Sequence, residues 1–182
     1  MATHDQSNLA TVFARGNASA ISQGELTSNE RILLESACVE LIGSIEQMLE
    51  QSAKEREAGY LGESAVIGNK ILLSLVDFSE GYVSGESLGD VYKVIAECYK
   101  GTQQVIDLAT SQTWGPFRKM LGKSTASNDE VAVAHKDCGS LIADALETSV
   151  GSGLSRLNDT TSVAAQLTES LEPILTELRT EW

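Results

Sequence analysis

The chain has 182 residues, enough for one domain with a sizeable core, and its net charge of −13 disfavours nucleic acid or anionic lipid as a partner. Only 5% of the residues are aromatic and only two are proline, so we expect aliphatic side chains to fill a core made of long, uninterrupted helices. The cysteines are few and widely spaced, no apolar run reaches the length of a membrane span, and the first residues lack a secretory pattern. These features predict a cytoplasmic or otherwise intracellular, non-secreted protein.

Residues 1–26 are interpreted as an N-terminal arm. They are rich in Ala, Ser, Asn, Gln, Gly and Thr, a composition that offers few apolar side chains for burial. Leu9, Val12 and Phe13 would give a short helix around residues 7–15 a small apolar face, so both disorder and docking to a partner are open for this arm. The remainder, residues 27–182, is expected to form one helical-bundle domain.

Three long helices are predicted in the first two thirds of the chain. The capping box from Thr27 to Glu30 marks the start of the first, which is expected to end near Glu57. The second is expected over residues 63–78. The pattern from Ser87 to Asp90 suggests the start of a third, which is expected to end near Gln112 and has the most regular spacing. Its apolar stripe consists of Leu88, Val91, Ile95, Cys98, Thr102, Val105 and Ala109.

The stretch from Thr113 to Ser124 interrupts this pattern. Gly115-Pro116 ends the third helix, and a short helix is expected over residues 117–122. The stretch contains no acid, although the chain has 26 acids against 13 bases. Two interpretations follow: an adhesive loop for a partner, or a plug that closes the bundle end while its bases pair with nearby acids. Its apolar residues are Trp114, Phe117, Met120 and Leu121, and its bases are Arg118, Lys119 and Lys123.

Two further helices complete the predicted fold. A capping box from Ser127 to Glu130 starts one that should end or loosen at Gly151–Gly153. The last should run over residues 159–182, with a kink or a restart at Pro173, and Trp182 would either cap the bundle or stay exposed for a partner. The predicted fold is therefore all-α: an antiparallel helical bundle of about five main helices with three-four apolar spacing and no sheet.

The sequence offers little for catalysis or metal binding. His135 and Cys138 stand three residues apart, close enough on a helix to share a metal ion, and Cys38 and Cys98 would have to converge on them. Each cysteine falls on an apolar stripe, however, which favours the interpretation as a small hydrophobic residue. No Glu-x-x-His pair, P-loop, GxGxxG or serine elbow is present. We therefore expect a non-enzyme with no catalytic residues, no cofactor and no metal.

The function that fits these expectations is protein–protein association by an acidic structural protein that self-assembles, giving a homo-oligomer. One alternative is an acidic inhibitor or immunity-type protein, whose acids would cluster on one face to bind a basic partner. Another is a subunit of an assembled coat or nucleoprotein that uses its basic loop on phosphates, since nucleic acid is not expected to bind a single chain. The predicted interaction residues are Trp114, Phe117, Arg118, Lys119, Met120, Lys123 and Trp182.

Overall fold

The computed structural model describes residues 26–157 and 162–182, and these residues contain helices and no strand. The all-α prediction is therefore confirmed. The long helices are α3 (Ser28–Glu57), α4 (Leu61–Tyr82), α5 (Gly85–Thr113), α7 (Asn128–Leu154) and α8 (Ser162–Thr180). Two shorter elements complete the described part of the chain: α6 (Gly115–Met120) between α5 and α7, and the 3-10 helix η1 (Ser155–Leu157) after α7.

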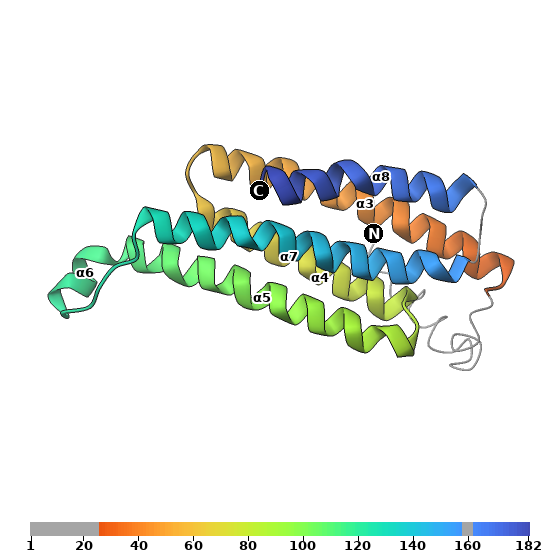
Figure 1. Ribbon diagram of the computed structural model, residues 1–182, viewed down its shortest axis with the longest axis horizontal. Helices are drawn as coiled ribbons and strands as arrows, with labels where there is room; N and C mark the ends of the chain where they lie inside the picture. Colours follow the sequence, from red (N-terminus) through yellow and green to blue (C-terminus); the bar gives the residue numbers. More distant parts are fainter. Residues whose placement is uncertain (1–25, 158–161) are drawn as a thin grey trace, which may run out of the picture.

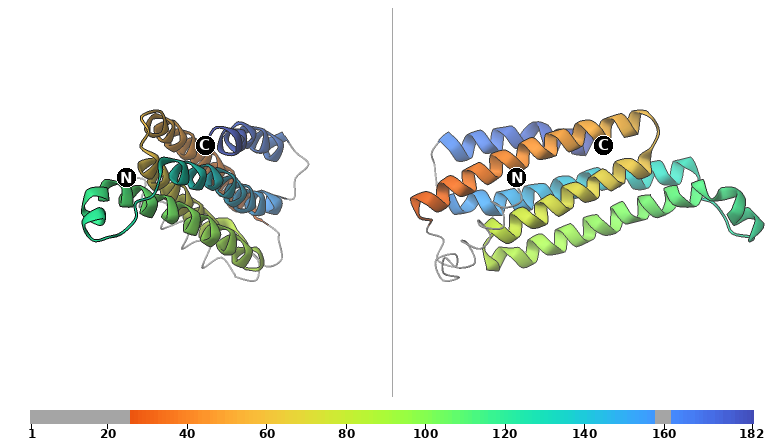
Figure 2. Two further views of the ribbon diagram at one scale, coloured as in Figure 1. Left: turned by 60° about the vertical axis from the view of Figure 1, so that its left-hand side comes forward. Right: turned by 180° about the vertical axis from the view of Figure 1, so that it is seen from behind.

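The helices alternate in direction along the bundle. Each of α3, α4, α5 and α7 packs against the long helix that follows it, α4 also packs against α7, and α8 packs against both α7 and α3. Figure 1 shows α4 and α7 running opposite to α3, α5 and α8. The pair α4 and α7 therefore forms the centre, with α3 and α8 on one side and α5 on the other (Figures 1 and 2).

Burial follows the number of neighbours that each helix has. On α5, the buried residues are spaced alternately four and three apart and coincide with members of the predicted stripe. On α4, burial extends over a wider face, because three other long helices pack against it. The buried positions of α5 are Val91, Ile95, Cys98, Thr102 and Val105.

Two helix starts are those that the capping boxes predicted. At α3, the amide of Glu30 donates to Thr27 Oγ1 at 3.2 Å, and the Glu30 carboxylate accepts from the Thr27 amide at 2.7 Å. Ser127 and Glu130 make the same reciprocal pair at α7. Each box satisfies two amides that the first turn of a helix leaves without partners.

The predicted start of α5 at Ser87 is wrong. The chain is extended at Val83 and Ser84, and the helix begins at Gly85, so Ser87 lies in its first turn. The Ser84 side chain makes no capping hydrogen bond. The Ser-x-x-Asp pattern therefore has no capping function here. An N-cap residue needs an extended backbone, and this conformation is found at Ser84, three residues before Ser87.

The last two helices are more continuous than expected. The helix α7 passes through Gly151 and Gly153 and ends at Leu154. A side chain at Gly153 would meet the Phe78 ring at 2.8 Å, so this glycine serves close packing between helices rather than helix termination. The helix α8 also continues through Pro173 without restarting. Its predicted start at residue 159 lies outside the described residues, as does the arm up to residue 25.

None of the described helices combines the length and the apolar composition needed to cross a membrane. The predicted boundary at residue 26 falls beside the first described residue, Leu26, which packs against the core. The bundle thus includes Leu26, which the prediction placed in the arm.

Candidate functional site

The segment between α5 and α7 forms a hairpin that projects beyond one end of the bundle (Figures 1 and 2). We call residues 114–127 the α6 hairpin. Hydrogen bonds attach the segment that returns from α6 to α7 to the last turn of α5. The Gln112 side chain donates to the carbonyl of Ala126 at 3.2 Å, and the amide of Ala126 donates to Ser111 Oγ at 3.3 Å. The base of the hairpin is therefore held on the bundle.

The tip of the hairpin is closed by its own hydrogen bonds. Arg118 Nε donates to the carbonyl of Ser124 at 3.0 Å, and the amide of Lys123 donates to the carbonyl of Arg118 at 2.8 Å. Gly122 has a φ of 68°, in the left-handed region that favours glycine, which lets the chain turn sharply after α6. These hydrogen bonds within the hairpin therefore help to hold the shape of its tip.

Large apolar side chains lie exposed along this hairpin. Trp114 and Phe117 meet edge to face with ring centroids 6.5 Å apart, yet they are 60% and 56% exposed, and Met120 is 83% exposed. Leu121 is also exposed. The interpretation of the aromatics as a plug for the bundle end is therefore wrong, because α6 extends away from the long helices instead of folding over their ends (Figure 1).

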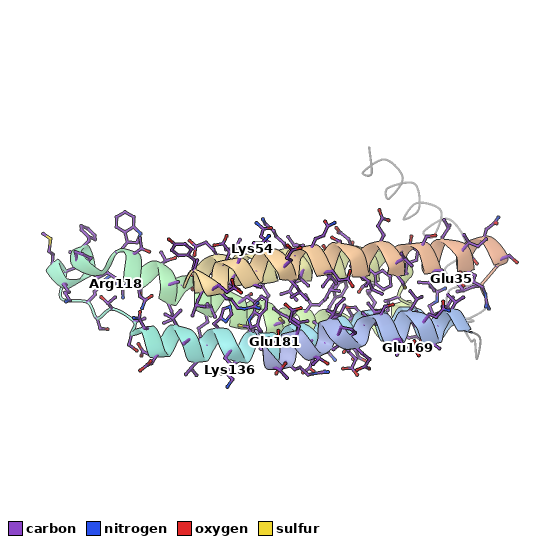
Figure 3. The ribbon with its side chains drawn as sticks, turned by 90° about the horizontal axis from the view of Figure 1, so that it is seen from above. Glu35, Lys54, Arg118, Lys136, Glu169 and Glu181 are labelled. Atoms are coloured by element: carbon purple, nitrogen blue, oxygen red, sulfur yellow. The ribbon has the colours of Figure 1, made fainter. Side chains whose placement is uncertain are left out.

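The three bases of the hairpin do not pair with acids either. Among the described residues, none of Arg118, Lys119 and Lys123 has a carboxylate within 4.0 Å. Figure 3 shows Arg118 within the hairpin, at one extreme end of the molecule. No acid occurs between Asp107 and Asp129. The hairpin is consequently a basic, apolar projection on an acidic bundle.

Two open grooves adjoin the hairpin. One, of about 470 Å³, runs between the end of α5 and α6, and the other, of about 740 Å³, lies between α5 and the segment that returns to α7. Asp107, Ser111 and Arg118 line both. The smaller groove also has Trp114 and Phe117 in its wall, so the exposed aromatic rings frame a concave surface as well as a projection.

No match to this chain is found among protein families, curated proteins or solved structures. Functional inference therefore depends on the geometry of the chain's own residues.

Trp182, predicted as an interaction residue, lies inside the bundle with only 9% of its surface exposed. Its indole stacks on the imidazole of His135, with centroids 5.0 Å apart and an angle of 2° between the planes. The Arg56 guanidinium lies 5.2 Å from the ring centroid, and Gly139 lies directly beside the indole. Trp182 therefore packs the C-terminal end of α8, which stops part-way along the bundle, against α7. Because it is buried there, it is not available to a partner.

The structure also assembles a buried polar chain that the sequence did not reveal. His135 Nε2 lies 2.8 Å from Ser64 Oγ, which lies 2.8 Å from Ser52 Oγ. Arg56 donates to Ser52 at 3.1 Å. These residues come from α3, α4 and α7, so no local spacing in the sequence indicates that they meet.

A serine beside a histidine is the geometry of an activated nucleophile, but here both side chains are buried. Neither groove described above includes them. Burial, with a smaller effect from the positive charge of Arg56, lowers the pKa of His135 to about 4, so the imidazole is neutral at pH 7. The chain of hydrogen bonds thus satisfies polar groups inside the core and joins three helices.

The metal-site interpretation of His135 and Cys138 has no support from the contacts. The Cys138 thiol donates to the carbonyl of Ala134 at 3.3 Å, while His135 bonds to Ser64. All three cysteines are buried, and burial is the main cause that raises the pKa of Cys38 and Cys98 to about 12 and that of Cys138 to about 11. Across the described residues, no three His, Cys, Asp or Glu side chains group closely enough to hold a metal ion.

Proposed function

We propose that this chain is a non-enzymatic association module that self-assembles through the α6 hairpin. The observation that carries the proposal is the exposure of Trp114, Phe117, Met120 and Leu121 on a projection whose three bases have no carboxylate partner in the described part of the chain. Exposed large apolar side chains next to one another mark interaction surfaces, and aromatic residues with arginine are the types enriched at interface centres.

The partner that fits this hairpin has apolar groups within an acidic surface. Such a surface complements the bases of the hairpin, and the rest of this chain is strongly acidic. A second copy of the chain thus supplies the required charge without any further protein. Self-assembly is for this reason the form of association that we propose.

The alternative of an acidic inhibitor requires carboxylates gathered on one face. Here, acids occur on every one of the five long helices, for example Glu46 on α3, Glu97 on α5 and Glu172 on α8. A distribution over all helices supports self-association better than it supports recognition of a single basic protein.

A subunit of a nucleic-acid-binding assembly is a second candidate, favoured by the exposed aromatic rings beside Arg118, Lys119 and Lys123. Rings of this kind stack on bases, and the cations contact phosphates. One hairpin has too few bases for tight binding, but an array would repeat them. If this function holds, replacing the three bases by alanine should abolish co-purification of nucleic acid, measured by the absorbance ratio at 260 and 280 nm. Purified wild-type protein free of nucleic acid would exclude the candidate.

The test of self-association replaces Trp114 and Phe117 by serine in the full chain. The matched control replaces Tyr60 and Leu73, which are 59% and 64% exposed, by serine elsewhere on the surface. Sedimentation velocity over a range of protein concentrations should show oligomers for the wild type and the control, and a monomer for the hairpin variant. A wild-type chain that stays monomeric at high concentration, or a hairpin variant that associates as well as the control, would contradict the proposal.

A further inference from the structure

The α6 hairpin, if it mediates self-association, requires a counterpart surface on a second copy. That surface must expose apolar side chains and must carry acids that no base already neutralises. The long helices expose large aliphatic side chains at Ile32, Val39, Val66, Leu73 and Val133. The charges beside these positions distinguish them.

Val66 and Leu73 on α4 both lie within four residues of Lys70, and Val133 on α7 lies three residues before Lys136. Side chains three or four residues apart are neighbours on a helix surface, so each of these apolar groups stands next to a positive charge. Acids flank the same positions: Glu63 lies three residues before Val66, Asp77 lies four residues after Leu73, and three acids lie within four residues of Val133. These places therefore present mixed charge to the basic hairpin, and a surface on which acids stand without a free base beside them is the better counterpart.

Ile32 and Val39 on α3 have a different setting. They are 58% and 62% exposed, and Glu35 lies three residues after the first and four residues before the second. Glu40 is exposed next to Val39, and neither glutamate takes part in an ion pair among the described residues. From residue 32 to residue 53, α3 carries four acids and no base, and Arg31, four residues before Glu35, donates its guanidinium to the carbonyl of Leu157 at 2.9 Å. Exposed aliphatic side chains and glutamates without ion-pair partners among the described residues therefore lie together on this part of α3.

Figure 3 places Glu35 at the end of the bundle opposite to Arg118. The length of α3, 30 residues, corresponds to about 45 Å at 1.5 Å per residue, so a hairpin cannot reach this surface of its own chain. Contact between the two surfaces therefore requires two molecules.

We infer that the α6 hairpin of one copy docks on the α3 ridge of another, the ridge being Ile32, Glu35, Val39 and Glu40. This inference rests on the proposed function and names the partner surface for it. Lys119 and Lys123 would approach the two glutamates, while the exposed rings of the hairpin would cover the two aliphatic side chains. The contact joins different surfaces at opposite ends of the molecule. Such a head-to-tail contact leaves one free hairpin and one free ridge, and it continues into an open array unless a ring closes.

The test uses charge reversal in the full chain. The hairpin variant carries Lys119→Glu and Lys123→Glu, which leave the Arg118 hydrogen bond to Ser124 in place. The ridge variant carries Glu35→Lys and Glu40→Lys, and Glu40→Lys alone serves as a milder form if the pair disturbs folding. A swap variant combines the hairpin and ridge reversals.

Two control variants match these changes in net charge at exposed positions elsewhere on the bundle. Lys70→Glu with Lys136→Glu matches the hairpin variant, and Glu169→Lys with Glu172→Lys matches the ridge variant. Association constants come from sedimentation equilibrium at one salt concentration. Any difference between a variant and its control then reports the position of the charges and not their sum.

The expected result is a loss of affinity of at least about tenfold for the hairpin and ridge variants relative to their controls, because like charges face each other at the contact. The swap variant should recover association. An equimolar mixture of the hairpin and ridge variants should also associate, into an alternating array, since the hairpin of each variant is complementary in charge to the ridge of the other.

The other outcomes distinguish a failure of the α3 ridge as the counterpart from a failure of self-association through the hairpin. If the hairpin variant loses association while both ridge variants behave as the control, the hairpin is the adhesive surface but the α3 ridge is not its counterpart. If the hairpin variant associates as its control does, the proposed function fails, and the inference fails with it.

Discussion

At the scale of single residues, the tightest arrangement in the molecule surrounds Trp182. The indole lies between the His135 ring and the Arg56 guanidinium, and its side chain fits only because residue 139 is glycine. Among the described residues, the indole N–H is one of the few buried polar groups without a hydrogen-bond partner. Packing and stacking, and not hydrogen bonding of the indole, therefore hold the end of α8 on the bundle.

Gly139→Ala should detach or displace this end of α8. An added Cβ would lie 2.1 Å from the carbonyl oxygen of Leu178 and 2.5 Å from Trp182 Cβ, and backbone atoms cannot yield as a flexible side chain does. We expect a loss of about 1–3 kcal/mol in the free energy of unfolding, measured by urea denaturation. Gly89→Ala is the control: nothing lies within 4 Å of its added Cβ, and alanine there should raise stability by up to about 1 kcal/mol. Equal stability of the two variants would contradict close packing at Gly139.

The free energy of unfolding should decrease on acidification because of His135. Burial, and then Arg56, lower its pKa in the folded chain from 6.5 to about 4, while the unfolded chain returns to the ordinary value. Between these two pH values, the unfolded chain binds a proton that the folded chain does not. The free energy of unfolding should therefore decrease by about 1–3 kcal/mol as the pH falls through this window, and His135 should add no further loss below it.

The variant His135→Gln isolates this effect. The carboxylates that titrate in acid are the same in both proteins, so the difference between their curves of unfolding free energy against pH belongs to His135. The variant should be less stable at pH 7, because the ring stack is lost, and should lose less on acidification. Parallel curves would show that His135 does not titrate with a lowered pKa.

At the scale of secondary-structure elements, the helix starts differ in how they are stabilised. The helices α3 and α7 begin with complete capping boxes, whereas Ser84, the residue before the first residue of α5, makes no side-chain capping bond. The start of α7 has a second importance, since it follows directly on the α6 hairpin. The capping box at Ser127 fixes the point where the segment returning from α6 enters α7.

Ser127→Ala should lower the free energy of unfolding by about 1 kcal/mol, because the amide of Glu130 loses its acceptor. Ser84→Ala is the comparison, and it should change stability much less, since that side chain makes no capping bond. Thermal unfolding followed by circular dichroism measures both. A cost at Ser84 equal to that at Ser127 would show that the capping bond does not account for the effect.

At the scale of the whole molecule, charge is unevenly distributed along the long axis. The bundle is acidic on every long helix, and the α6 hairpin at one end carries bases alone. Two copies with a net charge of −13 repel each other at a distance, whereas in the proposed contact a basic hairpin would be attracted to an acidic surface. Under this proposal, salt weakens the attraction at the contact, and the effect of ionic strength on association tests it.

Raising the salt concentration from about 0.1 M to about 1 M should reduce the average mass measured by light scattering. The Debye length shortens from about 10 Å to about 3 Å over this range, which weakens ion pairs at a contact, whereas repulsion over longer distances is already screened at the lower value. Chains that are monomeric at about 0.1 M salt and high protein concentration, or whose mass rises throughout, would contradict charge-assisted assembly.

What the sequence by itself determined is local. Apolar spacing on α5, the capping boxes at Thr27 and Ser127 and the break at Gly115-Pro116 depend on neighbours within a few residues, so the helices and the basic, apolar composition of the α6 hairpin could be predicted. The helix start at Ser87 was wrong because backbone conformation, and not pattern alone, selects a cap.

What only the tertiary structure decided is which side chains meet and which stay exposed. Trp114 and Trp182 are equally apolar in sequence, but α6 leaves the bundle and exposes the first, while α8 carries the second against Gly139 and His135. The polar chain between His135 and Ser52 likewise joins residues far apart in sequence. Burial results from the packing of several helices at once, and for that reason no stretch of sequence contains it.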